Sequence, residues 1–104
     1  GGTEWFEHDN LRVHRRKNQV YKGETEIRLT DKEYGILRIL LSNPGRTFSA
    51  EDIYTIVWQE PFTLSVSNTV IVHIRRLRQK IEDNPGTPSC IRTEWGRGYR
   101  IEKE

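Results

Sequence analysis

Four cationic side chains fall within the fourteen residues from 68 to 81, and no acidic residue accompanies them. They are Arg75, Arg76, Arg78 and Lys80. Guanidinium and ammonium groups bind phosphate oxygens, and an arginine can also donate two parallel hydrogen bonds to O6 and N7 of guanine. The whole chain has a net charge of only +2. A local charge of +4 on this one segment therefore favours a polyanionic partner.

The spacing of the apolar residues predicts that this segment, Asn68–Ile81, is an amphipathic helix. At about 100° per residue, the core-facing stripe consists of Val70, Ile74, Leu77 and Ile81. The opposite face carries Asn68, Val72, Arg75 and Gln79, with Arg76 and Arg78 on its flanks. His73 and Lys80 lie nearer the edge of the apolar stripe. That position favours contacts with a nucleic-acid backbone over contacts with bases.

This outer face has more than one interpretation. It is either an ordinary solvated surface or a surface that enters the major groove, where Asn or Gln can pair with adenine and a Val methyl can contact thymine. Within residues 68–81 no acid balances the four cations, so the usual pairing at i, i+4 is missing there. An exposed Val72 among arginines has no role in solubility, so DNA is favoured. The main alternative is a domain that binds another protein, because a fold alone does not imply DNA binding. Such a domain would replace these cations with apolar or acidic residues.

The preceding segments supply elements that could position the helix. Alternating apolar residues between 5 and 29 predict short strands in an antiparallel meander. Thr30 and Glu33 have the spacing of a capping box, so a first helix begins there, and Asn43-Pro44-Gly45 ends it. A second N-terminal signal at 49–52 starts another helix, which we expect to end near Gln59.

Residues 60–67 are expected to form a loop, because Pro61, the β-branched residues and the serines oppose a regular helix. Ser67 or Asn68 would then cap the third helix, which we expect to run to about Asp83. The apolar residues of the loop either contact another protein or pack over the helices; they are Phe62, Leu64 and Val66.

The C-terminal residues predict a β-hairpin with strands at 90–93 and 99–101, joined by Gly96-Arg97-Gly98. A cation on a thin hairpin can enter a minor groove. Alternatively, both glycines only provide positive φ at a tight turn. That interpretation explains the two glycines but not the arginine between them. The order of elements predicts an α+β winged helix-turn-helix: an N-terminal antiparallel β-meander, three helices and a C-terminal β-hairpin wing.

Length and composition set the limits. The chain has 104 residues, of which 34% are hydrophobic and 31% charged, as expected for a single globular domain with one small core. No apolar stretch could span a membrane or serve as a signal peptide. Cys90 is the only cysteine, which fits a reducing cytoplasm. Gly1-Gly2 is interpreted as a cloning remnant, so residues 1–104 are taken as one domain of a longer protein.

No pattern indicates catalysis, a metal or a cofactor. His8 and His14 are isolated, Cys90 has no second cysteine near it, and no nucleophile signature or carboxylate pair is present. We therefore expect no enzyme activity and no metal site. Trp58 closes the second helix and is interpreted as a core residue. Trp5 is interpreted as a packing residue that could alternatively face a second domain.

Long ordered motifs resemble a known family. They are Leu29-Thr30-x-x-Glu33, Asn43-Pro44-Gly45-Arg46, Val57-Trp58, the run from Thr69 to Lys80, and Gly96-Arg97-Gly98-Tyr99-Arg100. Together they resemble the C-terminal DNA-binding effector domain of OmpR/PhoB-type response regulators, from about Trp5 to Ile101. The run around the third helix is most similar to vancomycin-resistance-type regulators.

The resemblance implies a promoter-binding domain of a two-component regulator. Its partners would be double-stranded DNA, usually with direct repeats, RNA polymerase, a receiver domain of the same protein and, through that domain, a histidine kinase. The domain would be a monomer alone and a head-to-tail dimer on DNA. The implied DNA-binding residues, combined with those of the helical face, are Asn68, Thr69, Val72, His73, Arg75, Arg76, Arg78, Lys80, Thr93, Arg97 and Tyr99. RNA polymerase would meet Pro61, Phe62, Thr63 and Leu64.

Three residues depart from the family pattern. Many members carry Asp where Ile71 stands, and Val-Arg where Glu94-Trp95 stands. The missing arginine before Gly96 puts one contact between the wing and phosphate in doubt. Glu94 should point away from DNA, whereas Trp95 either packs on the domain or lies along a sugar.

Overall fold

Four short antiparallel strands open the chain in the computed structural model, which describes residues 4–103. They are β1 (Trp5–His8), β2 (Leu11–His14), β3 (Val20–Lys22) and β4 (Thr25–Ile27), and each pairs with the next. The predicted meander is confirmed. Leu29, expected in the last strand, lies beyond β4 but is buried. Gly1-Gly2 lies outside the described residues.

Three α-helices follow, each where the sequence places one. Helix α1 (Asp31–Ser42) begins at the Thr30–Glu33 capping box, in which each residue's side chain accepts a hydrogen bond from the other's backbone amide. Helix α2 (Ala50–Trp58) begins at an equivalent box between Ser49 and Asp52. It ends at Gln59, whose φ of 57° turns the chain out of the helix.

The third helix, α3, spans Thr69–Ile81, and both of its predicted ends need correction. Asn68 occupies the N-cap position, but its backbone is already helical and neither its side chain nor Ser67 caps the helix. A one-turn 3₁₀ helix, η2 (Leu64–Val66), leads into α3 and occupies part of the predicted loop. At the other end Glu82, not Asp83, terminates the helix in an extended conformation.

The carboxylate of Glu82 binds backbone amides that precede the hairpin, and this contact accompanies the end of the helix. Glu82 is buried and accepts hydrogen bonds from the backbone amides of Ser89, Cys90 and Ile91 at 2.8–3.2 Å. An extended backbone at Glu82 turns its side chain toward these amides, which precede the hairpin. The Asn84-Pro85-Gly86 turn therefore follows the end of α3 and does not cause it.

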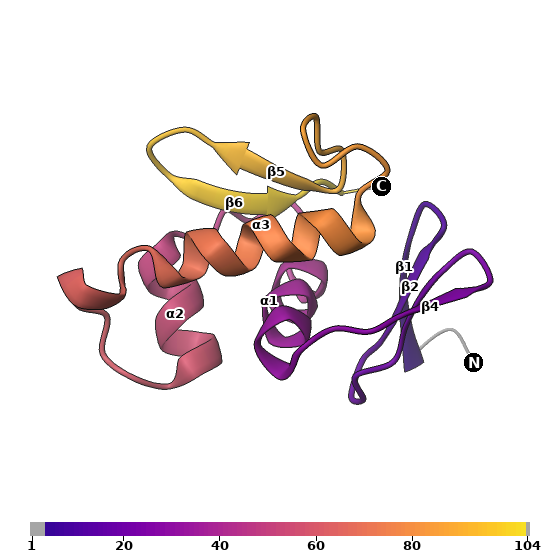
Figure 1. The fold of residues 1–104 in the computed structure, drawn as a ribbon, viewed down its shortest axis with the longest axis horizontal. Helices are drawn as coiled ribbons and strands as arrows, with labels where there is room; N and C mark the ends of the chain where they lie inside the picture. The colour runs from indigo at the N-terminus through magenta and orange to yellow at the C-terminus, as the bar shows by residue number, and fades with distance from the viewer. Residues whose placement is uncertain (1–3, 104) are drawn as a thin grey trace.

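The hairpin consists of β5 (Ile91–Glu94) and β6 (Gly98–Ile101) and lies alongside α3, with the sheet β1–β4 at the C-terminal end of that helix (Figure 1). Tyr99 and Phe48 exchange two backbone hydrogen bonds of 2.8 and 2.9 Å. Gly98 is paired with Glu94 as part of β6, so it is not a turn residue as expected. A Cβ on Gly98 would lie 2.0 Å from the Phe48 carbonyl oxygen, so glycine is required by close backbone approach.

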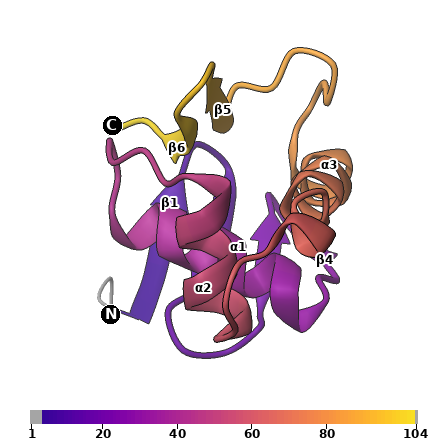
Figure 2. The same ribbon diagram turned by 90° about the vertical axis from the view of Figure 1, so that its left-hand side faces the viewer.

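The core lies where the helices meet the hairpin and the inner face of the sheet. Its fully buried side chains include Val13, Val20, Ile36, Leu37, Leu40, Ile53, Val70, Leu77, Ile91 and Ile101. Figure 2, turned by 90°, shows α3 end-on beside α1 and α2, with the hairpin above them. The predicted α+β winged helix-turn-helix is confirmed, and α3 has one face in the core and one face free.

Candidate nucleic-acid interface

The predicted division of α3 into two faces holds in the structure. All four stripe residues are buried: Val70, Ile74, Leu77 and Ile81. The polar side chains opposite them are exposed: Asn68, Arg75, Arg76 and Gln79. The exposed apolar residue is Ile71, at 43%, whereas Val72 is only partly exposed. Ile71 lines an open groove between α3 and the hairpin, and within residues 4–103 no other side chain fills that groove over it.

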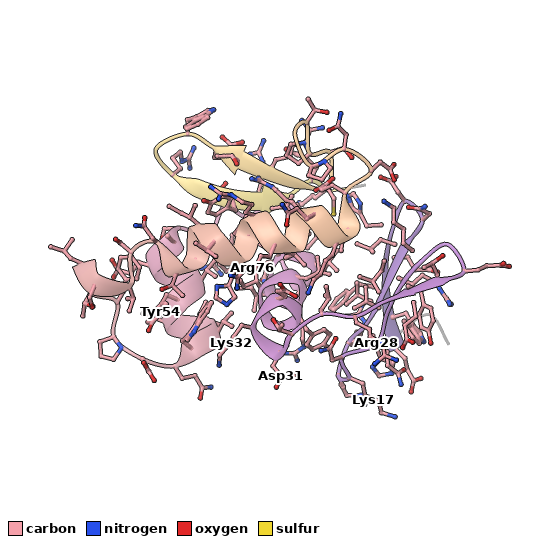
Figure 3. The ribbon with its side chains drawn as sticks, in the orientation of Figure 1. Lys17, Arg28, Asp31, Lys32, Tyr54 and Arg76 are labelled. Carbon is pink, nitrogen blue, oxygen red and sulfur yellow. The ribbon has the colours of Figure 1, made fainter. Side chains whose placement is uncertain are left out.

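The four cations of the segment separate into two pairs. Arg78 and Lys80 have intramolecular partners, described below. Within residues 4–103, Arg75 and Arg76 make no ion pair or side-chain hydrogen bond, so their guanidinium groups are free to bind an external anion. Arg75 lines the groove beside the hairpin. Figure 3 labels Arg76 on the edge of α3 that runs along α1.

Arg78 joins the helix to the hairpin. Its guanidinium donates to the Ile91 carbonyl oxygen at 2.9 and 3.3 Å and to Thr93 Oγ1 at 2.8 Å. It also lies 5.6 Å from the centre of the Tyr99 ring. Burial lowers the pKa of the Arg78 guanidinium. These contacts place Thr93 and Tyr99, two predicted contact residues, beside α3.

Lys80 joins the helix to α1. Its ammonium lies 2.6 Å from Oε1 of Glu33, which is 1% exposed and also accepts the Thr30 amide hydrogen. Burial raises the pKa of Glu33, but hydrogen bonds from Lys80 and Thr30 outweigh it and the net pKa is lowered. The capping box of α1 therefore also fixes one edge of α3.

His73 packs against α2, and its ring also lies close to the backbone of Thr69. His73 Nδ1 lies 2.7 Å from the Thr69 carbonyl oxygen, and its ring meets Trp58 edge-on at 4.9 Å. Trp58 in turn stacks on Tyr54 at 5.0 Å, as expected of a packing residue. Both His73 and Thr69 are partly buried.

The hairpin adds a second group of exposed side chains. Arg97 and Thr93 are exposed, Tyr99 is partly buried, and Trp95 is 92% exposed. Trp95 therefore does not pack on the domain, which was one of its two predicted positions. Glu94 pairs with Arg100 at 2.8 Å. Sequence reasoning missed Arg92, an exposed cation on β5 that has no ion pair within residues 4–103.

Two shallow grooves connect the helix with the hairpin. One of about 380 Å³ is lined by Ile71, Arg75, Arg78, Gln79 and Tyr99 among others. The other, of about 420 Å³, includes Ile71, Trp95 and Arg97. The grooves therefore connect the outer face of α3 with the hairpin, and unpaired cations predominate along them, although Glu51 lines the second groove.

The segment between α2 and α3 presents a separate surface. Leu64 is 93% exposed, and Pro61 and Thr63 are exposed beside it. Phe62 is partly buried, with its ring 5.8 Å from that of Tyr54. The two predicted alternatives for this segment thus apply to different residues: Phe62 packs inward, and Leu64 is open to a partner.

Residues 4–103 contain neither a cluster of metal ligands nor a membrane-spanning helix. Within that range no three His, Cys, Asp or Glu side chains are grouped so that they could hold a metal ion. No helix in the same range has the length and apolar character needed to cross a membrane.

Comparison with known proteins gives a consistent result. Residues 24–101 match the family model described as transcriptional regulatory protein, C terminal. The uncharacterized transcriptional regulatory protein YrkP of Bacillus subtilis (strain 168) is 52% identical over 91 residues, which are 88% of this chain and 39% of YrkP. The regulatory protein VanR of Enterococcus faecium is 38% identical over 96 residues, 92% of this chain and 42% of VanR. The chain thus spans about two fifths of the length of these relatives.

Solved structures agree with these relatives. The response regulator DrrB of Thermotoga maritima, described as an OmpR/PhoB homologue, superposes with a TM-score of 0.81 at 31% identity, covering 96% of this chain and 45% of DrrB. The DNA-binding domain of RstA from Klebsiella pneumoniae, crystallised in complex with the RstA box, has a TM-score of 0.84 at 22% identity. That match covers 95% of this chain and 97% of the RstA domain, and it is a likeness of fold.

Proposed function

The chain belongs to the C-terminal DNA-binding domains of OmpR/PhoB-type transcriptional regulators, and on that premise we propose that it binds double-stranded promoter DNA sequence-specifically and so controls transcription. The observation that carries the proposal is the outer face of α3, where Arg75 and Arg76 are exposed without ion pairs beside the exposed amides of Asn68 and Gln79. This family consists of transcription regulators and not of enzymes.

In the proposed complex α3 lies in the major groove. Arg75 and Arg76 donate to guanine O6 and N7 or to phosphates, and Asn68 pairs with adenine. Val72 and the backbone around Thr69 approach the groove from the same end of the helix. The hairpin lies beside α3, so Arg97 enters the neighbouring minor groove while Thr93 and Tyr99 contact the backbone.

Three predicted contact residues take a different main role in this proposal. His73, Arg78 and Lys80 have partners inside the domain, and we assign them first to positioning α3 against α2, the hairpin and α1. A direct phosphate contact from any of them stays a prediction, and it would be made with the donor hydrogens that these partners leave free.

The remaining partners follow from the family. We propose that the full protein carries a receiver domain controlled by a histidine kinase, acts in the cytoplasm and binds direct repeats as a head-to-tail dimer. RNA polymerase would contact the segment with Pro61, Phe62, Thr63 and Leu64. Leu64, at 93% exposure, is open to that contact.

The test begins by selecting bound sequences from random duplexes and measuring affinity by fluorescence anisotropy across a range of salt concentrations. Arg75→Ala or Arg76→Ala should each weaken binding by about 1–3 kcal/mol if the side chain contacts a base. A side chain that contacts phosphate should instead reduce the slope of log K against log salt by about 0.9.

Arg28→Ala is the matched control. It removes the same charge, but Arg28 lies near the sheet, away from α3 (Figure 3). If neither helix variant weakens binding more than Arg28→Ala does, α3 is not the recognition helix.

A further inference from the structure

Trp95 is the most conspicuous side chain that the proposed function does not yet use. It is 92% exposed at the turn of the hairpin. A tryptophan side chain carries a large apolar surface, and such residues are enriched where proteins contact a partner. Nothing within residues 4–103 covers it.

The turn that carries Trp95 is held rigidly. The Arg97 amide donates to the Glu94 carbonyl oxygen at 2.9 Å, and Gly96 between them has a φ of +76°. Behind the turn, the Phe48–Tyr99 backbone bonds fix β6 to the rest of the domain. The backbone that carries the indole is therefore held by hydrogen bonds, so ordering that backbone on binding costs little entropy.

The charges around Trp95 indicate what kind of partner would cover it. Trp95 lines one groove with Arg97 and another with Arg92, and neither arginine has an ion pair within residues 4–103. The neighbouring acid Glu94 pairs with Arg100 at 2.8 Å, and Arg100 also pairs with Glu102 at 2.6 Å. A second acid, Glu51, lines the groove that holds Arg97 and is exposed. An apolar ring between unpaired cations fits a surface that offers both phosphates and apolar rings, which describes the sugar-phosphate walls of a DNA minor groove.

We infer that Trp95 is a DNA-contact residue whose indole packs against the deoxyribose rings of the minor groove that Arg97 enters. This inference rests on the proposed function. The indole N–H can also donate to adenine N3 or thymine O2, the acceptors on the groove floor. An uncharged contact of this kind neutralises no phosphate, so it stabilises a complex without displacing counterions.

The two hairpin side chains therefore differ in how they respond to salt. Trp95→Ala should weaken binding about 5- to 30-fold at every salt concentration, as truncation of a tryptophan buried in an interface does, and leave the salt slope unchanged. Trp95→Phe should retain most of the affinity because a ring remains. Arg97→Ala, the matched comparison, should reduce the salt slope by about 0.9. Folding is not at issue, because Trp95 contacts little of the domain; urea unfolding of each variant checks this.

Fluorescence provides the second measurement. Wild-type minus Trp95→Phe difference spectra isolate the emission of Trp95 from that of Trp5 and Trp58. On adding the selected duplex, that emission should be quenched and protected from acrylamide. Unchanged emission together with wild-type affinity in Trp95→Ala would overturn the inference.

A two-site duplex separates DNA contact from contact between protein copies. If Trp95→Ala weakens binding only to a two-site duplex and not to a single site, Trp95 contacts a neighbouring copy and the inference is wrong. The proposed function itself fails only if the wild-type domain selects no duplex.

Discussion

Replacement of Lys80 by methionine tests whether this cation of α3 stabilises the fold through its ion pair with Glu33. The change keeps the aliphatic stem but removes the ammonium that lies 2.6 Å from Glu33. Glu33 keeps the Thr30 amide as a donor and is 1% exposed. A hydrogen bond between charged groups contributes about 1.5–3 kcal/mol, and breaking a fully buried pair costs about 3–5 kcal/mol.

Lys80 is 36% exposed, so water screens the pair and the lower range applies. We expect a loss of about 2–3 kcal/mol at pH 7, or roughly 8–20 °C in Tm for a domain of this size. Urea unfolding followed by circular dichroism measures it. Lys17→Met is the control, because Lys17 is exposed and lies at the far end of the molecule (Figure 3).

The difference between wild type and Lys80→Met should depend on pH. The net pKa of Glu33 is lowered in the fold. Its contribution to stability is therefore present above the ordinary glutamate pKa, about 4.3, and is lost as the pH falls through the lowered value. Without Lys80, the pKa of Glu33 is higher than in the wild type, so Glu33 becomes protonated at a higher pH in the variant. Protonation relieves the variant of its unpaired buried charge. The gap between the two proteins should shrink between pH 7 and pH 4. A gap that is the same at both pH values, or below about 0.5 kcal/mol at pH 7, would refute the reasoning.

Lys80→Met also separates a positioning role from direct contact with DNA. If Lys80 only positions α3, the variant should bind DNA more weakly with an unchanged salt slope. A slope reduced by about 0.9 would instead show a phosphate contact.

Two further predictions concern the hairpin. Gly98→Ala should destabilise the domain by about 3 kcal/mol or more, because its Cβ would overlap the Phe48 carbonyl oxygen at a φ of +144°; Gly23→Ala, in open space at a φ of +61°, should cost only about 1–2 kcal/mol. Equal losses in urea unfolding would contradict this. Arg78→Lys should cost about 1–2 kcal/mol, because one ammonium cannot reproduce the forked bonds to Ile91 and Thr93. It should also speed amide exchange in β5, and unchanged exchange would count against the link.

Sequence patterns predicted the features that depend only on residues close together in the chain. The buried stripe of α3 follows from a period of 3.6 residues, and the capping box at Thr30 and Glu33 from a spacing of three. Asn68 failed as a side-chain cap because η2 enters α3 with a backbone that is already helical. A sequence window does not reveal that approach.

The fate of the cations depended on partners far along the chain. Glu33 is 47 residues from Lys80, and Ile91 is 13 residues from Arg78. A helical wheel shows only the angle of each side chain, so it could place Lys80 at the core edge but could not identify its partner. Trp95 was ambiguous for the same reason, since the sequence does not show whether the body of the domain reaches the hairpin turn.

The local charge of +4 that marks the helix in the sequence therefore overstates what α3 alone can offer to DNA. Two of its cations hold the helix in place, and Arg75 and Arg76 remain free. The hairpin adds two further cations, Arg92 and Arg97, which are also unpaired within residues 4–103. Arg78 ties the hairpin to α3, so the two elements that carry these four charges are held in a fixed position relative to each other. Specific binding should then require both elements at once, so a variant that loosens the Arg78 link should weaken recognition even though every free cation remains.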